Sequence, residues 1–241
     1  MIQIGNFFFK YRNFLFIFLY LALFIPSAPL FSEQVFGPSY YLYPLLIGLA
    51  ITVSGQLIRG VTISLAYIVR GGKNKKVYAD HLVTSGIFAH CRNPLYVGNI
   101  LMLVGVGILI NSLLYTLVFI PLFLFIYQTI VLAEEHFLRR KFGADFDSYT
   151  RCVHRWLINF SGLGNTISGM HFSWKRWLIR EYNTQVLWLL CIAVILAFKY
   201  TAVWHWEISD RNTWFAATVG LLACYYGTVK YLKKSGKWKI V

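Results

Sequence analysis

Long apolar stretches alternate with shorter polar segments along the chain. A helix needs roughly 20 predominantly apolar residues to cross a bilayer, and a backbone in lipid has to satisfy its own hydrogen bonds. The short alternating segments of a membrane barrel do not occur in this sequence. The pattern therefore predicts an all-α, polytopic membrane protein with about six transmembrane helices. The expected spans are Phe14–Leu30, Tyr40–Ile58, Leu95–Ile110, Leu113–Ala133, Val186–Val203 and Thr213–Leu232.

Composition and charge support this prediction. Of the 241 residues, 58% are hydrophobic and 13% are charged, whereas a soluble domain carries about 25% charged residues. The net charge is +14, and the basic residues gather before the first span, after the second and fourth spans, and in the tail. By the positive-inside rule, this distribution predicts that both termini and these segments face the cytoplasm. Topology and contact with anionic lipid explain the charge better than nucleic-acid binding does.

The spans divide the chain into three regions. Residues 1–70 form an N-terminal two-helix membrane region, and residues 161–241 form a C-terminal one. Residues 71–160 form a central core with a helical hairpin and an amphipathic segment. Arg59 is expected near the inner interface, where its side chain would snorkel towards water, and a substrate contact is the alternative. The Gly-, Ser- and Asn-rich stretch 161–169 predicts a loop.

The third and fourth spans are expected to form the hairpin. Pro94 suits the first turn of a helix, and Asn111-Ser112 predicts a tight turn between the spans. Gly98, Gly105 and Gly107 would let a neighbouring helix approach closely. The hairpin would bring the ends of both spans to the same membrane level.

Polar residues gather at this level. The segment Arg92–Gly98 precedes the third span, and Glu134-Glu135 follows the fourth. Ionisable groups at the edge of a membrane are functional candidates, so we expect a cytoplasm-facing pocket here. Residues 134–156 mix apolar and charged positions at helical spacing, which predicts an amphipathic segment broken near Gly143.

The order of these motifs resembles the isoprenylcysteine carboxyl methyltransferase and phospholipid methyltransferase superfamily. The resemblance covers about Asp80–Trp156, a third of the chain. It implies an integral membrane enzyme that transfers a methyl group from S-adenosylmethionine to a membrane-partitioned acceptor, either a lipid amine or a carboxylate. The motifs are Leu82–Phe88, Arg92–Gly98 and Glu134-Glu135, followed by Leu138, Phe142-Gly143, Phe146, Tyr149, Val153 and Arg155.

The resemblance also implies which residues bind the cofactor. A carboxylate such as Glu134 can accept hydrogen bonds from ribose hydroxyls or from the amino group. The aromatic faces of Phe88 and Tyr96 can hold the adenine or lie near the sulfonium. The implied cofactor-binding residues are His81, Leu82, Val83, Phe88, Asn93, Pro94, Tyr96 and Glu134.

Arg92 and Glu135 are the candidate catalytic residues. Arg92 could pair with the carboxylate of the cofactor or stabilise one of the two glutamates, and the sequence leaves this open. A general base is needed only where the acceptor carries a proton, and Glu135 or His81 could then serve. No metal site is predicted, because no cysteine pair has the spacing of metal ligands.

Two positions depart from the family pattern. Asn93 stands where the family often has histidine, so proton transfer at that position is excluded. Ile130 stands where enzymes acting on prenylated cysteine place an arginine for the substrate carboxylate. The second departure favours other membrane-partitioned acceptors, phospholipid amines among them.

Two other functions compete with methyl transfer. The first is an NADPH-dependent membrane reductase of the sterol reductase type, for which the basic segment Lys73–Lys76 could hold a 2′-phosphate. The second is a transporter. The sequence has neither the internal repeat nor the interrupted helices typical of transporters, and its polar residues gather at one end of the spans.

Overall fold

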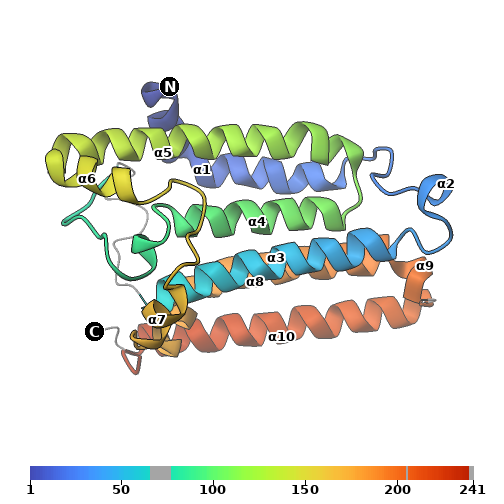
Figure 1. The fold of residues 1–241 in the computed structure, drawn as a ribbon. Coiled ribbons are helices and arrows are strands. Elements are labelled where there is room, and N and C mark those ends of the chain that lie inside the picture. Colours follow the sequence, from blue (N-terminus) through green and yellow to red (C-terminus); the bar gives the residue numbers. More distant parts are fainter. Residues whose placement is uncertain (66–76, 205, 239–241) are drawn as a thin grey trace.

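The computed structural model of the chain describes residues 1–65, 77–204 and 206–238. Regular structure in these residues is entirely helical, which confirms the all-α prediction. The long helices lie side by side, and short helices cap their ends (Figure 1). The long helices are α1 (Ile2–Leu21), α3 (Leu42–Leu65), α4 (Pro94–Leu109), α5 (Ile120–Phe142), α8 (Trp174–Lys199) and α10 (Ile208–Lys234). The short ones are α2 (Glu33–Phe36), α6 (Ala144–Cys152), α7 (Leu163–Ser168) and α9 (Thr201–Trp204).

Each expected span overlaps a long helix, but the bounds differ, most of all for Phe14–Leu30, because α1 already begins at Ile2 and ends at Leu21. Not all of these helices qualify as spans. Four segments are long and apolar enough to cross a membrane: Ile2–Phe24, Leu42–Leu65, Tyr115–Phe142 and Trp174–Lys199. Helix α4 is apolar but has 16 residues, and α10 has 27 residues but a more polar composition. The chain is therefore a membrane protein with four helices that meet both criteria among the described residues. The expected domain boundary at residues 70 and 71 and the basic segment Lys73–Lys76 lie outside those residues.

Helices α3 and α4 approach closely through glycines. A Cβ atom on Gly98 would lie 2.5 Å from Cγ of Arg59 and 2.7 Å from the carbonyl oxygen of Gly55. On Gly105 it would lie 2.4 Å from the backbone nitrogen of Thr52. Any larger residue would push the two backbones apart, so these glycines permit the contact. The predicted close approach of a neighbouring helix is confirmed for Gly98 and Gly105, and α3 is that helix. Gly107 instead faces Tyr115 and Ile120.

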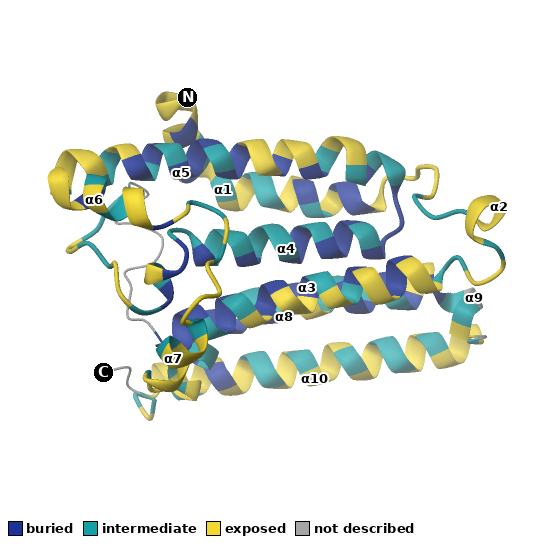
Figure 2. Cartoon of the chain, in the orientation of Figure 1, coloured by how far each residue is buried: buried dark blue, intermediate teal, exposed yellow. Residues whose placement is uncertain are grey.

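Buried hydrogen bonds tie α8 to this pair of helices. Thr52 on α3 donates its hydroxyl to the carbonyl oxygen of Met102 on α4 at 3.0 Å. It also accepts a hydrogen bond from Nε1 of Trp188 on α8 at 2.7 Å. Figure 2 shows buried positions concentrated where α3, α4, α5 and α8 face one another, while α10 is mostly exposed or intermediate. In the described part of α10, Val229 alone is buried.

The hairpin turn between α4 and α5 forms as predicted. Helix α4 begins at Pro94, and Asn111 adopts a positive φ of 55° in the turn. The Asn111 side chain accepts a hydrogen bond from the backbone nitrogen of Phe31 at 2.8 Å and donates to its carbonyl oxygen at 2.9 Å. The turn is therefore held by the segment that follows α1.

The amphipathic segment also forms, with its break at the expected glycine. Helix α5 continues past the expected end of the span to Phe142. Gly143 then adopts a positive φ of 53°, and α6 begins at the next residue. Phe146 on α6 is 1% exposed, so the apolar face of this short helix packs inwards.

The stretch 161–169 was expected to be a loop, and this prediction is wrong, because α7 occupies its centre. Tertiary contacts explain the helix. The His90 ring lies 2.8 Å from the carbonyl oxygen of Asn159 and 2.8 Å from the hydroxyl of Thr166 on α7. A polar sequence with weak helix propensity is thus stabilised by a side chain from the central region.

Candidate active site

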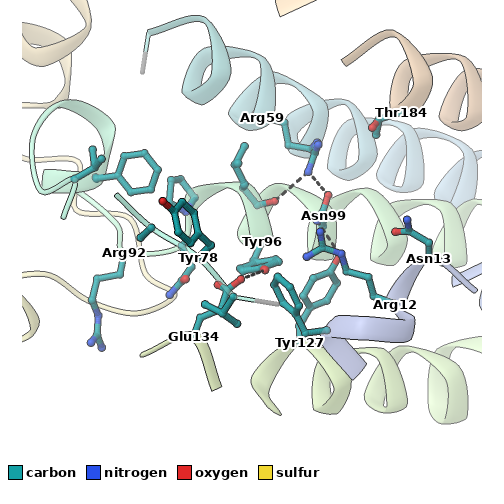
Figure 3. Close-up of a pocket in the computed structure, with 18 of the residues that line it drawn as sticks. Arg12, Asn13, Arg59, Tyr78, Arg92, Tyr96, Asn99, Tyr127, Glu134 and Thr184 are labelled. Atoms are coloured by element: carbon teal, nitrogen blue, oxygen red, sulfur yellow. Dashed lines mark hydrogen bonds between the residues drawn. The ribbon is translucent and has the colours of Figure 1, made fainter. Parts of the chain in front are cut away.

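A cavity of about 680 Å³ enters the molecule at the end that carries α6. Its walls are α1, α3, α4, α5, α6, α8 and the segment 77–96. Figure 3 shows polar side chains from α1, α3, α4 and α8 around it. The volume lies within the range of about 300–1,000 Å³ that is typical of small-molecule sites.

The cavity brings together every residue that the sequence comparison with the family implied for cofactor binding. Arg92, a candidate catalytic residue, lines it as well. These residues come from the segment 77–96, the start of α4 and the end of α5, which the hairpin places at one level. Their role in holding a cofactor stays a prediction. The implied residues that line the cavity are His81, Leu82, Val83, Phe88, Asn93, Pro94, Tyr96 and Glu134.

Glu134 faces this cavity from α5. The Tyr96 hydroxyl, on α4, donates a hydrogen bond to Oε1 of Glu134 at 2.7 Å (Figure 3). Among the described residues, Oε2 of Glu134 accepts no hydrogen bond. The carboxylate is therefore fixed by one oxygen, while the other can accept hydrogen bonds from a ligand.

Glu135, the next residue along α5, points away from the cavity and is 7% exposed. Arg155 donates to both of its oxygens, from Nε at 2.9 Å and from Nη2 at 2.7 Å. Nη1 of Arg92 lies 3.2 Å from Oε1 of Glu135, and Figure 3 shows the Arg92 guanidinium turned away from Tyr96 and Glu134. Arg92 was expected to pair either with the carboxylate of the cofactor or with one of the two glutamates, and the structure shows the ion pair with Glu135. The hydrogen bonds to Glu135 raise the pKa of Arg155, which keeps that partner charged.

Hydrogen bonds fasten the segment 77–96 to α6 and to the residues that follow it. The backbone nitrogen of Arg92 donates to the carbonyl oxygen of His154 at 3.0 Å. Nδ2 of Asn93 donates to the carbonyl oxygen of Arg155 at 3.2 Å. The Tyr149 hydroxyl donates to the carbonyl oxygen of Phe88 at 2.7 Å. Burial raises the pKa of Tyr149, so this hydroxyl keeps its proton.

Arg59 is a cavity residue whose partner was not identified from the sequence. It is 3% exposed, so the predicted snorkelling is wrong. Its Nε and Nη2 donate to the two carboxylate oxygens of Glu181 on α8, each at 2.8 Å. Nη1 donates to Oδ1 of Asn99, and Nδ2 of Asn99 donates to the Tyr127 hydroxyl at 2.7 Å. A carboxylate near the start of an apolar helix was the signal that could have identified this partner, because buried charges are paired.

Residues 43–145 match the family model described as phospholipid methyltransferase. We refer to residues 43–145, which are similar to this family, as the methyltransferase region. This region contains Arg59, the segment 77–96 and the two glutamates of α5. It therefore holds the α3, α4 and α5 walls of the cavity and the segment 77–96 that lines it.

Several curated proteins are similar to part of the chain. A probable protein-S-isoprenylcysteine O-methyltransferase of Oryza sativa is 28% identical over 123 residues, which are 48% of this chain and 62% of the relative. The protein-S-isoprenylcysteine O-methyltransferase of Schizosaccharomyces pombe is 37% identical over 92 residues, 37% of each chain. The cobalt-zinc-cadmium resistance protein CzcN of Cupriavidus metallidurans is 34% identical over 106 residues, 44% of each chain. The chain thus spans less than two thirds of the length of each of these relatives. No solved structure matches the chain significantly.

The remaining cavity wall lies outside the methyltransferase region. Arg12 and Asn13 reach the cavity from α1, and Asn183 and Thr184 reach it from α8. From the sequence, Arg12 was assigned only to membrane topology, and the other three had no role. Their spacing offers no motif, so only the packing of α1 and α8 against the methyltransferase region could reveal them.

Proposed function

We propose that the chain is an integral membrane methyltransferase that transfers a methyl group from S-adenosylmethionine to a membrane-partitioned acceptor. The observation that carries this proposal is the pairing of Tyr96 with Glu134 at the wall of the cavity. The pair lies in the region that matches the methyltransferase family, and the cavity reaches from the end of the helices into their apolar interior.

The residues around this pair fit S-adenosylmethionine. The free oxygen of Glu134 can accept hydrogen bonds from hydroxyl or amino groups. Phe88 and Tyr96 line the same cavity and offer aromatic faces to an adenine or a sulfonium. The backbone around Phe88 is fixed by Tyr149, so this part of the site is organised before a ligand enters.

When bound, S-adenosylmethionine supplies a methyl carbon that is already activated, because the neighbouring sulfur is a positively charged leaving group. A lone pair of the acceptor forms the new bond while the carbon–sulfur electron pair returns to sulfur, which leaves as a thioether. The task of the chain is therefore to align the two partners and to exclude water. A cavity that reaches into the helix bundle serves both purposes.

Glu135 acts in this proposal as a positioning residue. Its two oxygens are occupied by arginines, and it does not line the cavity. Through Arg92 and Arg155 it holds the segment that carries Asn93 and Pro94 against the end of α6. An acceptor that carries a proton would then lose it to His81, which lines the cavity, or to water.

The orientation in the membrane follows from the basic residues. The start of α1 and the end of α10 lie towards the end of the molecule that carries α6 and α7 (Figure 1). Basic residues are concentrated in these segments, so we assign this end, including the mouth of the cavity, to the cytoplasm.

The experiment that tests the proposal is calorimetric titration of detergent-purified protein with S-adenosylmethionine. Hydrogen bonds to charged groups contribute about 1.5–3 kcal/mol, so Glu134→Gln is expected to weaken binding by about 10- to 150-fold. Tyr96→Phe removes the bond that fixes Glu134 and is expected to weaken binding by about tenfold or less.

Matched controls remove the same groups far from the cavity. Glu33→Gln changes a carboxylate on α2, and Tyr43→Phe changes a tyrosine that is 45% exposed. Both are expected to bind like the wild type. A folded wild-type protein that does not bind S-adenosylmethionine would overturn the proposal, and titration with NADPH would then test the reductase alternative.

A further inference from the structure

We propose that Arg12 is the residue that binds an anionic group, a carboxylate or a phosphate, of the amphipathic acceptor. This inference rests on the proposed function and deepens it. It concerns the outer half of the cavity, which we define by Arg12 and Asn13 on α1 and by Asn183, Thr184 and Leu187 on α8.

The three arginines that line the cavity differ in their partners. Arg59 is paired with Glu181, and Arg92 is paired with Glu135. Arg12, in contrast, forms no ion pair or hydrogen bond with any residue that the structure describes. Its guanidinium carbon lies 4.5 Å from the centre of the Phe9 ring, which supports one of its faces and leaves its donors directed elsewhere.

The position of Arg12 directs these donors into the cavity. Figure 3 shows its side chain reaching from α1 towards Asn99 and Tyr127 on the facing helices. Arg12 is only partly exposed, and a partly buried guanidinium away from bulk water favours an anionic partner. Its planar set of donors matches the oxygens of a carboxylate or a phosphate.

Glu134 does not fill this role. Although it faces the same cavity, no ion pair joins it to Arg12 within the described residues, and its carboxylate is hydrogen-bonded to the Tyr96 hydroxyl. The cavity therefore holds an acidic group on α5 and a basic group on α1 that face a shared space. Two ligands of opposite character suit this arrangement, one with hydrogen-bond donors at Glu134 and one with an anionic group at Arg12.

The outer half also has an apolar edge for the rest of an amphipathic molecule. Ile17 on α1 and Leu187 on α8 both line the cavity, yet they are 57% and 53% exposed. Helix α1 packs mainly on α5, whereas α8 packs on α3, α4 and α10. The cavity thus reaches the apolar surface of the bundle between α1 and α8, where an alkyl chain can extend into lipid while its anionic group stays at Arg12.

The test measures binding and does not depend on methyl transfer. Full-length protein in an uncharged maltoside detergent is titrated with three probes that share a hexadecyl-length chain: N-hexadecanoylglycine, hexadecyl phosphate, and the neutral primary amide of N-hexadecanoylglycine. The wild type is expected to bind at least one anionic probe about tenfold or more tightly than the amide. The tighter of the two anionic probes identifies carboxylate or phosphate as the preferred group.

Variants assign the preference to Arg12. Arg12→Gln is expected to abolish it, and Arg12→Lys, which keeps the charge, is expected to retain part of it. Lys10→Gln removes a neighbouring charge on α1 that does not line the cavity, and it should leave the preference unchanged. Affinity for S-adenosylmethionine should change by less than about twofold in Arg12→Gln.

Three outcomes would overturn the inference. One is a wild type that binds the amide as tightly as the anions, and another is an Arg12→Gln protein that keeps the preference. The third is a loss of S-adenosylmethionine affinity in Arg12→Gln, which would place Arg12 in the cofactor site. A wild type that shows the anion preference but binds no S-adenosylmethionine would refute the proposed function and leave this inference standing.

Discussion

The two sides of the cavity differ in how their polar groups are paired. On the inner side, formed by α3, α4, α5 and the segment 77–96, polar side chains that line the cavity have protein partners: Tyr96 binds Glu134, and Arg92 pairs with Glu135 behind the wall. On the outer side, formed by α1 and α8, Arg12 makes no hydrogen bond or ion pair with the described residues. The inner side belongs to the region that matches the methyltransferase family, and the outer side lies beyond it.

This difference suggests that the inner side binds the cofactor and the outer side selects the acceptor. Paired polar groups hold a fixed geometry before a ligand enters, as the proposed binding of a common cofactor requires. Polar groups without protein partners are available to a second ligand, so helices outside the family region can set which acceptor is used. The same family region could then serve different acceptors in proteins with different flanking helices.

The largest expected effect comes from breaking the ion pair between Arg59 on α3 and Glu181 on α8, which joins the two sides of the cavity. Arg59→Met removes both hydrogen bonds that Arg59 donates to the fully buried carboxylate of Glu181. Breaking one side of a buried ion pair costs about 3–5 kcal/mol. We expect a lower unfolding midpoint of the detergent-solubilised protein in a denaturant titration.

An exposed pair provides the control for this prediction. Arg139 and Asp147 lie 2.7 Å apart with side chains that are 54% and 44% exposed, and Arg139→Met is expected to cost less than about 1 kcal/mol. Equal losses for Arg59→Met and Arg139→Met would mean that the buried pair does not tie α3 to α8.

The next effect concerns the packing of the inner side. Gly98→Ala places a Cβ atom 2.7 Å from the carbonyl oxygen of Gly55, and overpacking of this kind costs about 1–3 kcal/mol. On α10, a Cβ atom added to Gly220 would have no described neighbour within 4 Å, so Gly220→Ala should be neutral or stabilising by up to about 1 kcal/mol. Thermal unfolding of both variants checks the prediction, and a Gly98→Ala protein as stable as the wild type would contradict it.

The smallest expected effect concerns the hydrogen bond that fixes the backbone at Phe88. Tyr149→Phe removes the hydrogen bond to the carbonyl oxygen of Phe88, which is expected to cost about 0.5–1.5 kcal/mol. Hydrogen exchange should speed up in the segment around Phe88. Tyr231→Phe, at a residue that is 60% exposed, is the control. Unchanged exchange around Phe88 would show that other contacts hold this segment.

The pattern of apolar and polar residues was sufficient to predict the helical architecture and to place Tyr96 and Glu134 at one level. The lining residues of the segment 77–88 were named only through the family resemblance. Pro94, Asn111 and Gly143 have backbone preferences that are visible in the sequence, and each marks a boundary where predicted. Tyr96 lies near the start of α4, and Glu134 lies near the end of α5, the next long helix. A hairpin therefore brings Tyr96 and Glu134 together without further information.

The outer side could not be predicted in the same way, because it depends on contacts between distant parts of the chain. Arg59 and Glu181 are 122 positions apart, and no local pattern pairs them. Arg12 has the sequence context of a topogenic charge, and only the packing of α1 on α5 turns it towards the cavity. Helix α7 was missed for the same reason, since His90 holds it from outside its own sequence.

The adjacency of Glu134 and Glu135 has a consequence for how α5 can move. Successive residues of a helix point about 100° apart, so one carboxylate faces the cavity while the other binds Arg155 and Arg92. A rotation of α5 about its axis by a single position would turn the anchoring carboxylate into the cavity and break its contacts with Arg92 and Arg155. The two glutamates thus couple the rotational setting of α5 to the position of the segment 77–96.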